Sequence, residues 1–149
     1  MKRAVVNGYK APHKPILLLS VAELIECDKI KGCKIELNDD LILKFKELWR
    51  QYVDSDDNET EIIKVGEELM WEQKKTYPFK CNIANPYFHL SNEPFWTLEK
   101  NEKWIEKSSY NIKSLREYYE SAKLDEQLFT LIKDSESRMT ICKTLRNLI

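Results

Sequence analysis

The sequence predicts an α+β domain in which a small antiparallel sheet or hairpin packs on helices. Three observations predict this class: an apolar helical segment near the N-terminus, short β-prone runs with prolines between them in the middle, and helical patterns over the last third. A chain of 149 residues, 42% of them hydrophobic, has the size and composition of one folded domain. We therefore expect residues 1–149 to form a single domain.

The first predicted helix follows a proline-containing loop. Pro15 suits the first turn of a helix, where its missing N–H costs nothing, and the apolar residues after it predict a largely buried helix to about Cys27. The alternation of polar and apolar residues over 34–37 predicts a short strand. Asn38 is a favourable cap for a second helix over 39–53. The apolar face of that helix contains Leu41, Phe45, Leu48, Trp49 and Tyr52.

The middle of the chain carries the strongest strand signals. Residues 87–90 and 95–98 are β-prone runs, and the polar residues 91–94 between them predict a β-hairpin. Residues 104–105 are expected to add a further strand. Before the hairpin, residues 59–72 are expected to be partly helical.

The last third of the chain is predicted to be helical. The expected helices cover about residues 114–121, 125–133 and 137–149. Their expected caps are Asp125 and either Ser135 or Ser137.

Charge is distributed unevenly along the chain. The segment from Asp54 to Glu72 contains eight acidic residues against the single base Lys64, and it carries −7. Because the whole chain carries −1, the remainder carries +6, which permits a basic face there.

The N-terminus lacks a signal peptide, and no apolar run approaches the roughly 18 residues of a membrane span, so we expect a cytoplasmic protein with no membrane partner.

Residues suited to catalysis are scarce. The chain has two histidines, and its four cysteines lack the spacing of a zinc site. No nucleophile-elbow, zinc-protease, phosphate-loop or dinucleotide-binding motif occurs. We therefore expect no catalytic residue, no metal and no cofactor, and a binding module rather than a complete enzyme. An intact nuclease with an unrecognised site is the alternative.

Two prolines enclose a His-Lys pair at the start of the first helix, in the run Lys10-Ala11-Pro12-His13-Lys14-Pro15. A helix start exposes N–H donors and the positive end of the helix dipole, and adjacent cations strengthen it as a site for an anion such as a nucleic-acid phosphate. The other interpretation is that His13 only caps the helix or packs at its start. The spacing of the residues does not choose between the two.

The same run resembles the opening of a known domain. Residues 9–19 are similar to the first motif of the sulfur-binding domain found in HNH-type, modification-dependent restriction endonucleases. Three further segments resemble that domain in the same order, namely the strand, cap and helix over 35–49, the proline and aromatic residues of 85–98, and the closing helices around 124–138. The resemblance spans nearly the whole chain, and its first segment is the most specific.

The resemblance implies binding of double-stranded DNA in which sulfur replaces one non-bridging oxygen of a phosphate, a phosphorothioate. It implies that His13 and Lys14 contact the modified phosphate, and that Pro86 and Tyr87 form an apolar wall for the sulfur. Polar residues around 108–113 would reach toward the bases. The DNA-binding residues that it implies are His13, Lys14, Lys10, Asn85, Pro86, Tyr87, His89, Ser109 and Lys113.

This chain also differs from the family. Asn85 stands where the family often has an aromatic residue, and Lys14 stands where some members have an arginine, which forms bidentate contacts that lysine cannot. The nuclease half has no counterpart here, so cleavage would need a nuclease partner or an HNH domain after Ile149. The alternative function is a protein-interaction or regulatory domain that keeps the fold without binding DNA, which the near-zero net charge favours. DNA binding through this motif requires Pro86 to lie beside His13 and Lys14.

Overall fold

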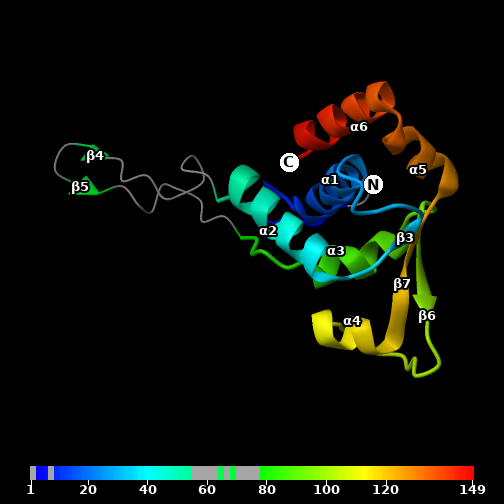
Figure 1. Ribbon diagram of the computed structural model, residues 1–149. Coiled ribbons are helices and arrows are strands. Elements are labelled where there is room, and N and C mark those ends of the chain that lie inside the picture. Colours follow the sequence, from blue (N-terminus) through cyan, green and yellow to red (C-terminus); the bar gives the residue numbers. More distant parts are fainter. Residues whose placement is uncertain (1–2, 7–8, 55–63, 66–67, 70–77) are drawn as a thin grey trace.

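The computed structural model describes residues 3–6, 9–54, 64–65, 68–69 and 78–149, and these form an α+β structure, as predicted (Figure 1). The helices are α1 (His13–Glu26), α2 (Asp39–Tyr52), α3 (Ala84–His89), α4 (Ile112–Tyr118), α5 (Glu126–Lys133) and α6 (Ser135–Asn147). The strands β3 (Lys34–Ile35), β7 (Tyr119–Leu124) and β6 (Trp96–Lys100) form an antiparallel sheet in that order. Two further antiparallel pairs are β1 (Val5–Val6) with β2 (Tyr9–Lys10) and β4 (Lys64–Val65) with β5 (Glu68–Leu69).

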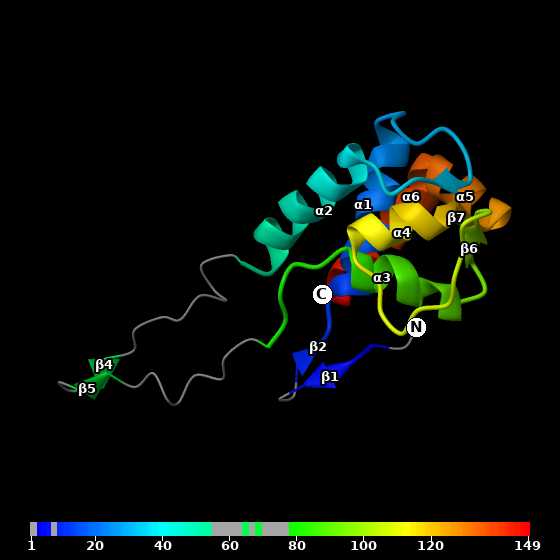
Figure 2. The same cartoon turned by 90° about the horizontal axis from the view of Figure 1, so that it is seen from below.

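Helix α1 forms the centre of the fold because its apolar side chains surround the whole helix. Eleven of its 14 residues are buried, and a helix that is apolar on every side must be enclosed by other elements. Helices α2, α3, α5 and α6 all contact it, and Figures 1 and 2 show α2 and α6 on different sides of it. The predicted buried helix is therefore confirmed. It begins at His13, which places Pro15 in its first turn.

Helix α2 begins where the sequence predicts and ends at Tyr52, one residue before the predicted end, and Tyr52 is the one residue of the predicted apolar face that is only half-buried. The Asn38 side chain accepts a hydrogen bond from the Leu41 N–H at 3.0 Å, and Asp39 and Asp40 lie in the first turn, where the helix dipole favours negative charge. The buried residues of the helix are Leu41, Phe45, Leu48 and Trp49. The cap and the amphipathic pattern therefore suffice to define this element.

Replacing Asn38 with alanine should lower the free energy of unfolding by about 1 kcal/mol, because one N–H group in the first turn of α2 loses its acceptor. Urea denaturation measures the change. A suitable control is Asn147→Ala, which alters an exposed asparagine at the end of α6 and should change stability by less than about 0.5 kcal/mol. Equal stability of the two variants would show that the cap contributes nothing.

The predicted hairpin between residues 87–90 and 95–98 is wrong. Residues 87–90 belong to α3 and to the short 3-10 helix η2 (Leu90–Asn92), and β6 pairs with β7 instead. Pro86 is the third residue of α3, a position where a helix needs no N–H donor. The Asn82 side chain also accepts a hydrogen bond from the Asn85 N–H at 3.3 Å. A proline and an asparagine thus start a helix in a run with strand-like side chains.

The C-terminal third contains a strand that the sequence prediction misses. Helix α4 ends at Tyr118, and residues 119–124 form β7, the central strand of the sheet, so the predicted helix over 114–121 is wrong beyond Tyr118. The pairing of β7 with both β3 and β6 stabilises this strand. The cap of α5 is Asp125, as predicted, whereas that of α6 is Asp134 rather than Ser135 or Ser137.

Two other predictions concern the loops. Residues 104–105 are not a strand but part of the loop between β6 and α4, where the Trp104 N–H donates to the Asn101 carbonyl at 3.2 Å. The expected partial helix over 59–72 lies mostly outside the described residues, and it is wrong for Lys64–Val65 and Glu68–Leu69, which are strands.

None of the helices in the described ranges is both long enough and apolar enough to cross a lipid bilayer.

Candidate nucleic-acid interface

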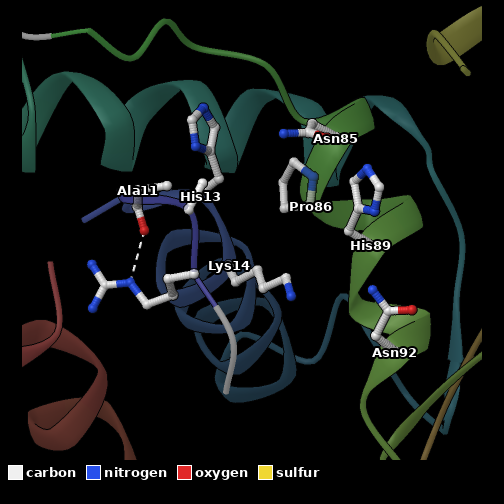
Figure 3. Close-up of a pocket in the computed structure, with 9 residues that line it drawn as sticks. Ala11, His13, Lys14, Asn85, Pro86, His89 and Asn92 are labelled. Atoms are coloured by element: carbon white, nitrogen blue, oxygen red, sulfur yellow. Dashed lines mark hydrogen bonds between the residues drawn. The ribbon is translucent and has the colours of Figure 1, made fainter. Parts of the chain in front are cut away.

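A cavity of about 380 Å³ lies between the start of α1 and helix α3 (Figure 3). Residues 85, 89 and 92 lie on one face of α3 and η2, as their helical spacing requires, and Lys14 extends from α1 toward that face (Figure 3). The structure thus brings together two segments that are about 70 residues apart in the sequence. The residues that line this α1–α3 cavity are Arg3, Ala4, Ala11, His13, Lys14, Asn85, Pro86, His89 and Asn92.

The α1–α3 cavity has a basic lining. Arg3 and Lys14 supply cations, and the lining contains no carboxylate among the residues that the structure describes. The Arg3 Nε–H donates to the Ala11 carbonyl at 2.8 Å, which holds the N-terminal segment against the start of α1. Burial, and then the nearby charge of Lys14, lowers the pKa of His89. His89 is therefore a neutral polar group at neutral pH, and the positive charge comes from Arg3 and Lys14.

His13 lines the cavity, and its ring also packs against aromatic side chains of the core. Its ring lies 4.7 Å from that of Trp49 and 5.7 Å from that of Phe79, measured between centroids. Its Nε2–H donates to the Lys80 carbonyl at 2.8 Å, while Nδ1 is buried without a hydrogen-bond partner among the described residues. Burial lowers the pKa of His13, and the bond to Lys80 offsets this only in part. His13 is thus a neutral ring that fixes the start of α1, and it adds no positive charge.

The stability of the protein should depend on pH through His13. Burial holds the pKa of folded His13 below its ordinary value of 6.5, whereas the unfolded chain keeps that value. As the pH falls through 6.5, the unfolded chain takes up a proton that folded His13 resists, so the free energy of unfolding decreases until the pH passes the lowered pKa. We expect the wild-type protein to lose more stability than His13→Gln between about pH 7.5 and about pH 5.5, measured by urea denaturation.

The matched control is His89→Gln, which leaves His13 in place and should retain the contribution of His13 to the pH dependence. Glutamine at position 13 keeps a donor for the Lys80 carbonyl, so that the comparison isolates the titrating ring. An identical pH dependence in the wild type and His13→Gln would contradict a buried neutral His13.

Four of the implied DNA contacts do not line the α1–α3 cavity. Tyr87 is 1% exposed, and its hydroxyl donates to the Ile35 carbonyl at 2.6 Å, so it ties α3 to the sheet and does not form the expected apolar wall. Lys10 is exposed on β2, Ser109 is exposed in the loop before α4, and Lys113 is exposed on α4. Of the two residues expected to form the apolar wall, Pro86 lines the cavity and Tyr87 does not.

Four lining residues were not among the predicted contacts: Arg3, Ala4, Asn92 and Ala11, the last of which lies within the quoted motif. Asn92 follows Asn85 and His89 at helical spacing, so the prediction of a helix over 84–92 would have found it. For Arg3 and Ala4 no local signal exists, because the β1–β2 pairing brings them back beside Ala11, whose N–H donates to the Ala4 carbonyl at 2.7 Å.

The lining suits an anion that has one apolar side. Arg3 and Lys14 provide positive charge, and the Pro86 ring provides apolar surface. Asn85 and Asn92 can donate or accept hydrogen bonds.

In the comparisons with known proteins, no family model matches the chain, and the search of curated proteins finds no match.

Proposed function

We propose that this chain binds double-stranded DNA through the α1–α3 cavity and recognises a phosphorothioate in the DNA backbone. The observation that carries the proposal is the lining of the cavity, which combines the cations of Lys14 and Arg3 with the Pro86 ring and has no carboxylate among the described lining residues. The resemblance of residues 9–19 to the sulfur-binding domain of restriction endonucleases supports the same ligand. Within a restriction or defence system, cleavage would come from an associated nuclease or a further HNH domain.

The charge of the cavity accounts for affinity rather than selectivity. Lysine and arginine attract every DNA phosphate, and such contacts position the duplex without reading its sequence. Two exposed lysines lie near the cavity. Lys10 directly precedes the lining residue Ala11, and the main-chain carbonyl of Lys80 accepts a hydrogen bond from His13. Both lysines would add to the attraction of DNA outside the cavity. The overall charge of −1 does not oppose the proposal. The segment from Asp54 to Glu72 carries −7, so the rest of the chain carries +6.

The apolar wall accounts for the selectivity. Sulfur is larger, more polarizable and more weakly hydrated than oxygen, so it loses less hydration free energy when it lies against the Pro86 ring. A phosphate oxygen in the same place would lose its water without gaining a hydrogen bond, which is costly. The discrimination thus comes from a penalty on the ordinary phosphate as well as from contact with sulfur.

Binding to matched duplexes tests the proposal. Duplexes of one sequence would carry an ordinary phosphate or either of the two diastereomers of a single phosphorothioate, since sulfur makes the phosphorus chiral. We expect tighter binding of one diastereomer by the wild-type protein. Equal affinity for the three duplexes would reject sulfur recognition, and no binding at low salt would reject DNA binding and favour the protein-interaction alternative.

The variant Pro86→Ala tests the role of the wall. Alanine is compatible with the first turn of α3, and the change removes two methylene groups that the sulfur would contact. At about 0.8 kcal/mol for each buried methylene, the preference for sulfur should fall about tenfold. The affinity for the unmodified duplex should not fall and should rise slightly, because a phosphate oxygen loses less water beside alanine than beside the proline ring. A preference that survives in Pro86→Ala would show that another group selects the sulfur.

A further inference from the structure

A second cavity, of about 580 Å³, lies on the neighbouring side of α3 and is lined by aromatic rings. It is bounded by α3 and η2, by β6, and by the loop over residues 101–111, which runs from β6 to α4 (Figure 2). Its volume lies within the range of about 300–1,000 Å³ that is typical of ligand sites. The rings of this aromatic cavity belong to Phe88, Trp96, Trp104, Tyr110 and Tyr119.

The aromatic cavity is preformed, because a chain of hydrogen bonds fixes its rings. The Trp104 Nε1–H donates to the Tyr119 hydroxyl at 3.0 Å, the Tyr119 hydroxyl to that of Tyr110 at 3.4 Å, and the Tyr110 hydroxyl to the Ile105 carbonyl at 3.2 Å. The donors of these rings are therefore used within the protein. What the half-buried Trp104 and Tyr110 offer a ligand is aromatic surface rather than directional donors.

The charges at the aromatic cavity disfavour a cationic ligand. The Lys100 ammonium lies 3.8 Å from the centroid of the Trp104 ring, so the attraction of that ring for a cation is already used. Lys107 also lines the cavity, and its ammonium lies 5.4 Å from the Tyr118 ring. Glu93 and Glu106 balance the two lysines in the lining. A flat ligand without a positive charge fits this environment.

Helix α3 and η2 form a wall that the aromatic cavity shares with the α1–α3 cavity. Asn85, His89 and Asn92 face the α1–α3 cavity, whereas Phe88 and Ser91, on the adjoining face, line the aromatic cavity. The rings of Phe88 and His89 are in contact, with centroids 5.2 Å apart. A polymer whose backbone lies in the first cavity therefore passes next to the second.

We propose that the aromatic cavity holds an unpaired nucleobase, turned out of the duplex, from the DNA strand whose backbone lies in the α1–α3 cavity. This inference rests on the proposed function. A base inside a duplex cannot enter a concave site, so it must leave the stack, and stacking on aromatic side chains offsets the lost base stacking. Since the ring donors are already bonded, the site accepts any base by its flat face and adds affinity without reading base identity.

Binding of duplexes with one unpaired base tests this inference on the full chain. In one series, each base within about three nucleotides of the phosphorothioate is placed opposite an abasic site, so that the base is present and already unpaired. In the matched series the base itself is removed and its partner kept. We expect one position at which the unpaired base tightens binding about tenfold, the scale of a single stack, and at which its removal abolishes the gain.

Two variants test whether the tighter binding caused by the unpaired base arises in the aromatic cavity. Trp104→Ala should lose it, whereas Trp104→Phe, which keeps an aromatic ring but not the N–H, should retain most of it. Lys103→Ala is the control, since this exposed lysine lies in the same loop outside the cavity lining. Circular dichroism checks that each variant is folded, and the comparison of base present with base absent in the wild-type protein needs no variant.

The possible results separate this inference from the proposed function. If no position distinguishes a present base from an absent one while sulfur still tightens binding, the inference is overturned and the proposed function stands. If the unpaired base tightens binding while sulfur makes no difference to the affinity, the base site stands and sulfur recognition fails. Persistence of the full gain in folded Trp104→Ala overturns the inference, and absence of binding to every duplex overturns both.

Discussion

Replacing Lys14 with alanine is expected to weaken binding of the phosphorothioate duplex by about tenfold or more, the scale of one charge-assisted hydrogen bond. Lys14 extends from the start of α1 into the α1–α3 cavity, opposite Pro86 (Figure 3). The loss should be similar for duplexes of different sequence, because a phosphate contact carries no sequence information. The slope of log K against log salt should fall in magnitude by about 1, since one phosphate contact is lost. Titrations at several salt concentrations measure both effects.

Two further variants make the Lys14 prediction specific. Lys14→Arg should retain or increase the affinity, because a guanidinium can contact two oxygens of one phosphate. Lys143→Ala removes an exposed lysine of α6 outside the cavity lining and should leave affinity and salt slope nearly unchanged. If Lys14→Ala and Lys143→Ala behaved alike, the α1–α3 cavity would not be the DNA site.

Trp96→Ala is expected to lower the free energy of unfolding by about 3–5 kcal/mol, as for other large buried aromatic residues. Trp96 is 1% exposed, its ring meets that of Tyr87 edge to face at 5.5 Å, and its Nε1–H donates to the Tyr87 carbonyl at 2.9 Å. The substitution leaves a void and removes a donor from a buried carbonyl. A domain of this size has a total stability of about 5–15 kcal/mol, so urea denaturation should show a large shift.

The matched control for Trp96→Ala is Leu43→Ala, which removes a side chain that is 63% exposed on α2 and should change stability by less than about 0.5 kcal/mol. Trp96→Phe should give an intermediate loss, because it keeps a ring but leaves the Tyr87 carbonyl without its donor. A loss below about 1 kcal/mol in Trp96→Ala would mean that the contact between β6 and α3 does not hold the fold together.

Local sequence patterns predict the elements whose stabilising contacts are close in the chain. The apolar run after Pro15 predicts α1, and the Asn38 cap with the face that includes Phe45 and Trp49 predicts α2. Asp125, as the cap of α5, is likewise read from its neighbours. In each case the hydrogen bonds and the burial pattern involve residues within about four positions of one another, so the sequence contains the full signal.

Long-range contacts decide the elements that local patterns predict wrongly. Tyr87 lies in a strand-like run, yet its hydroxyl bonds to the Ile35 carbonyl, 52 residues away, and its carbonyl accepts from Trp96. Tyr119 follows helical sequence, yet it begins a strand that pairs with β6 on one side and β3 on the other. Intrinsic preferences of a residue for helix or strand amount to about 1 kcal/mol or less, which several such contacts exceed.

The same division applies to the candidate site. The sequence by itself determined the first helix with its His-Lys pair, the uneven charge and the asparagine-proline pair at positions 85–86. Only the tertiary structure decided that Pro86 lies in the wall opposite Lys14, that Tyr87 is buried, and that Arg3 and Asn92 complete the lining. The physical reason is that a helix turns its successive side chains through about 100°, so which of them face a ligand depends on what the rest of the chain packs against that helix.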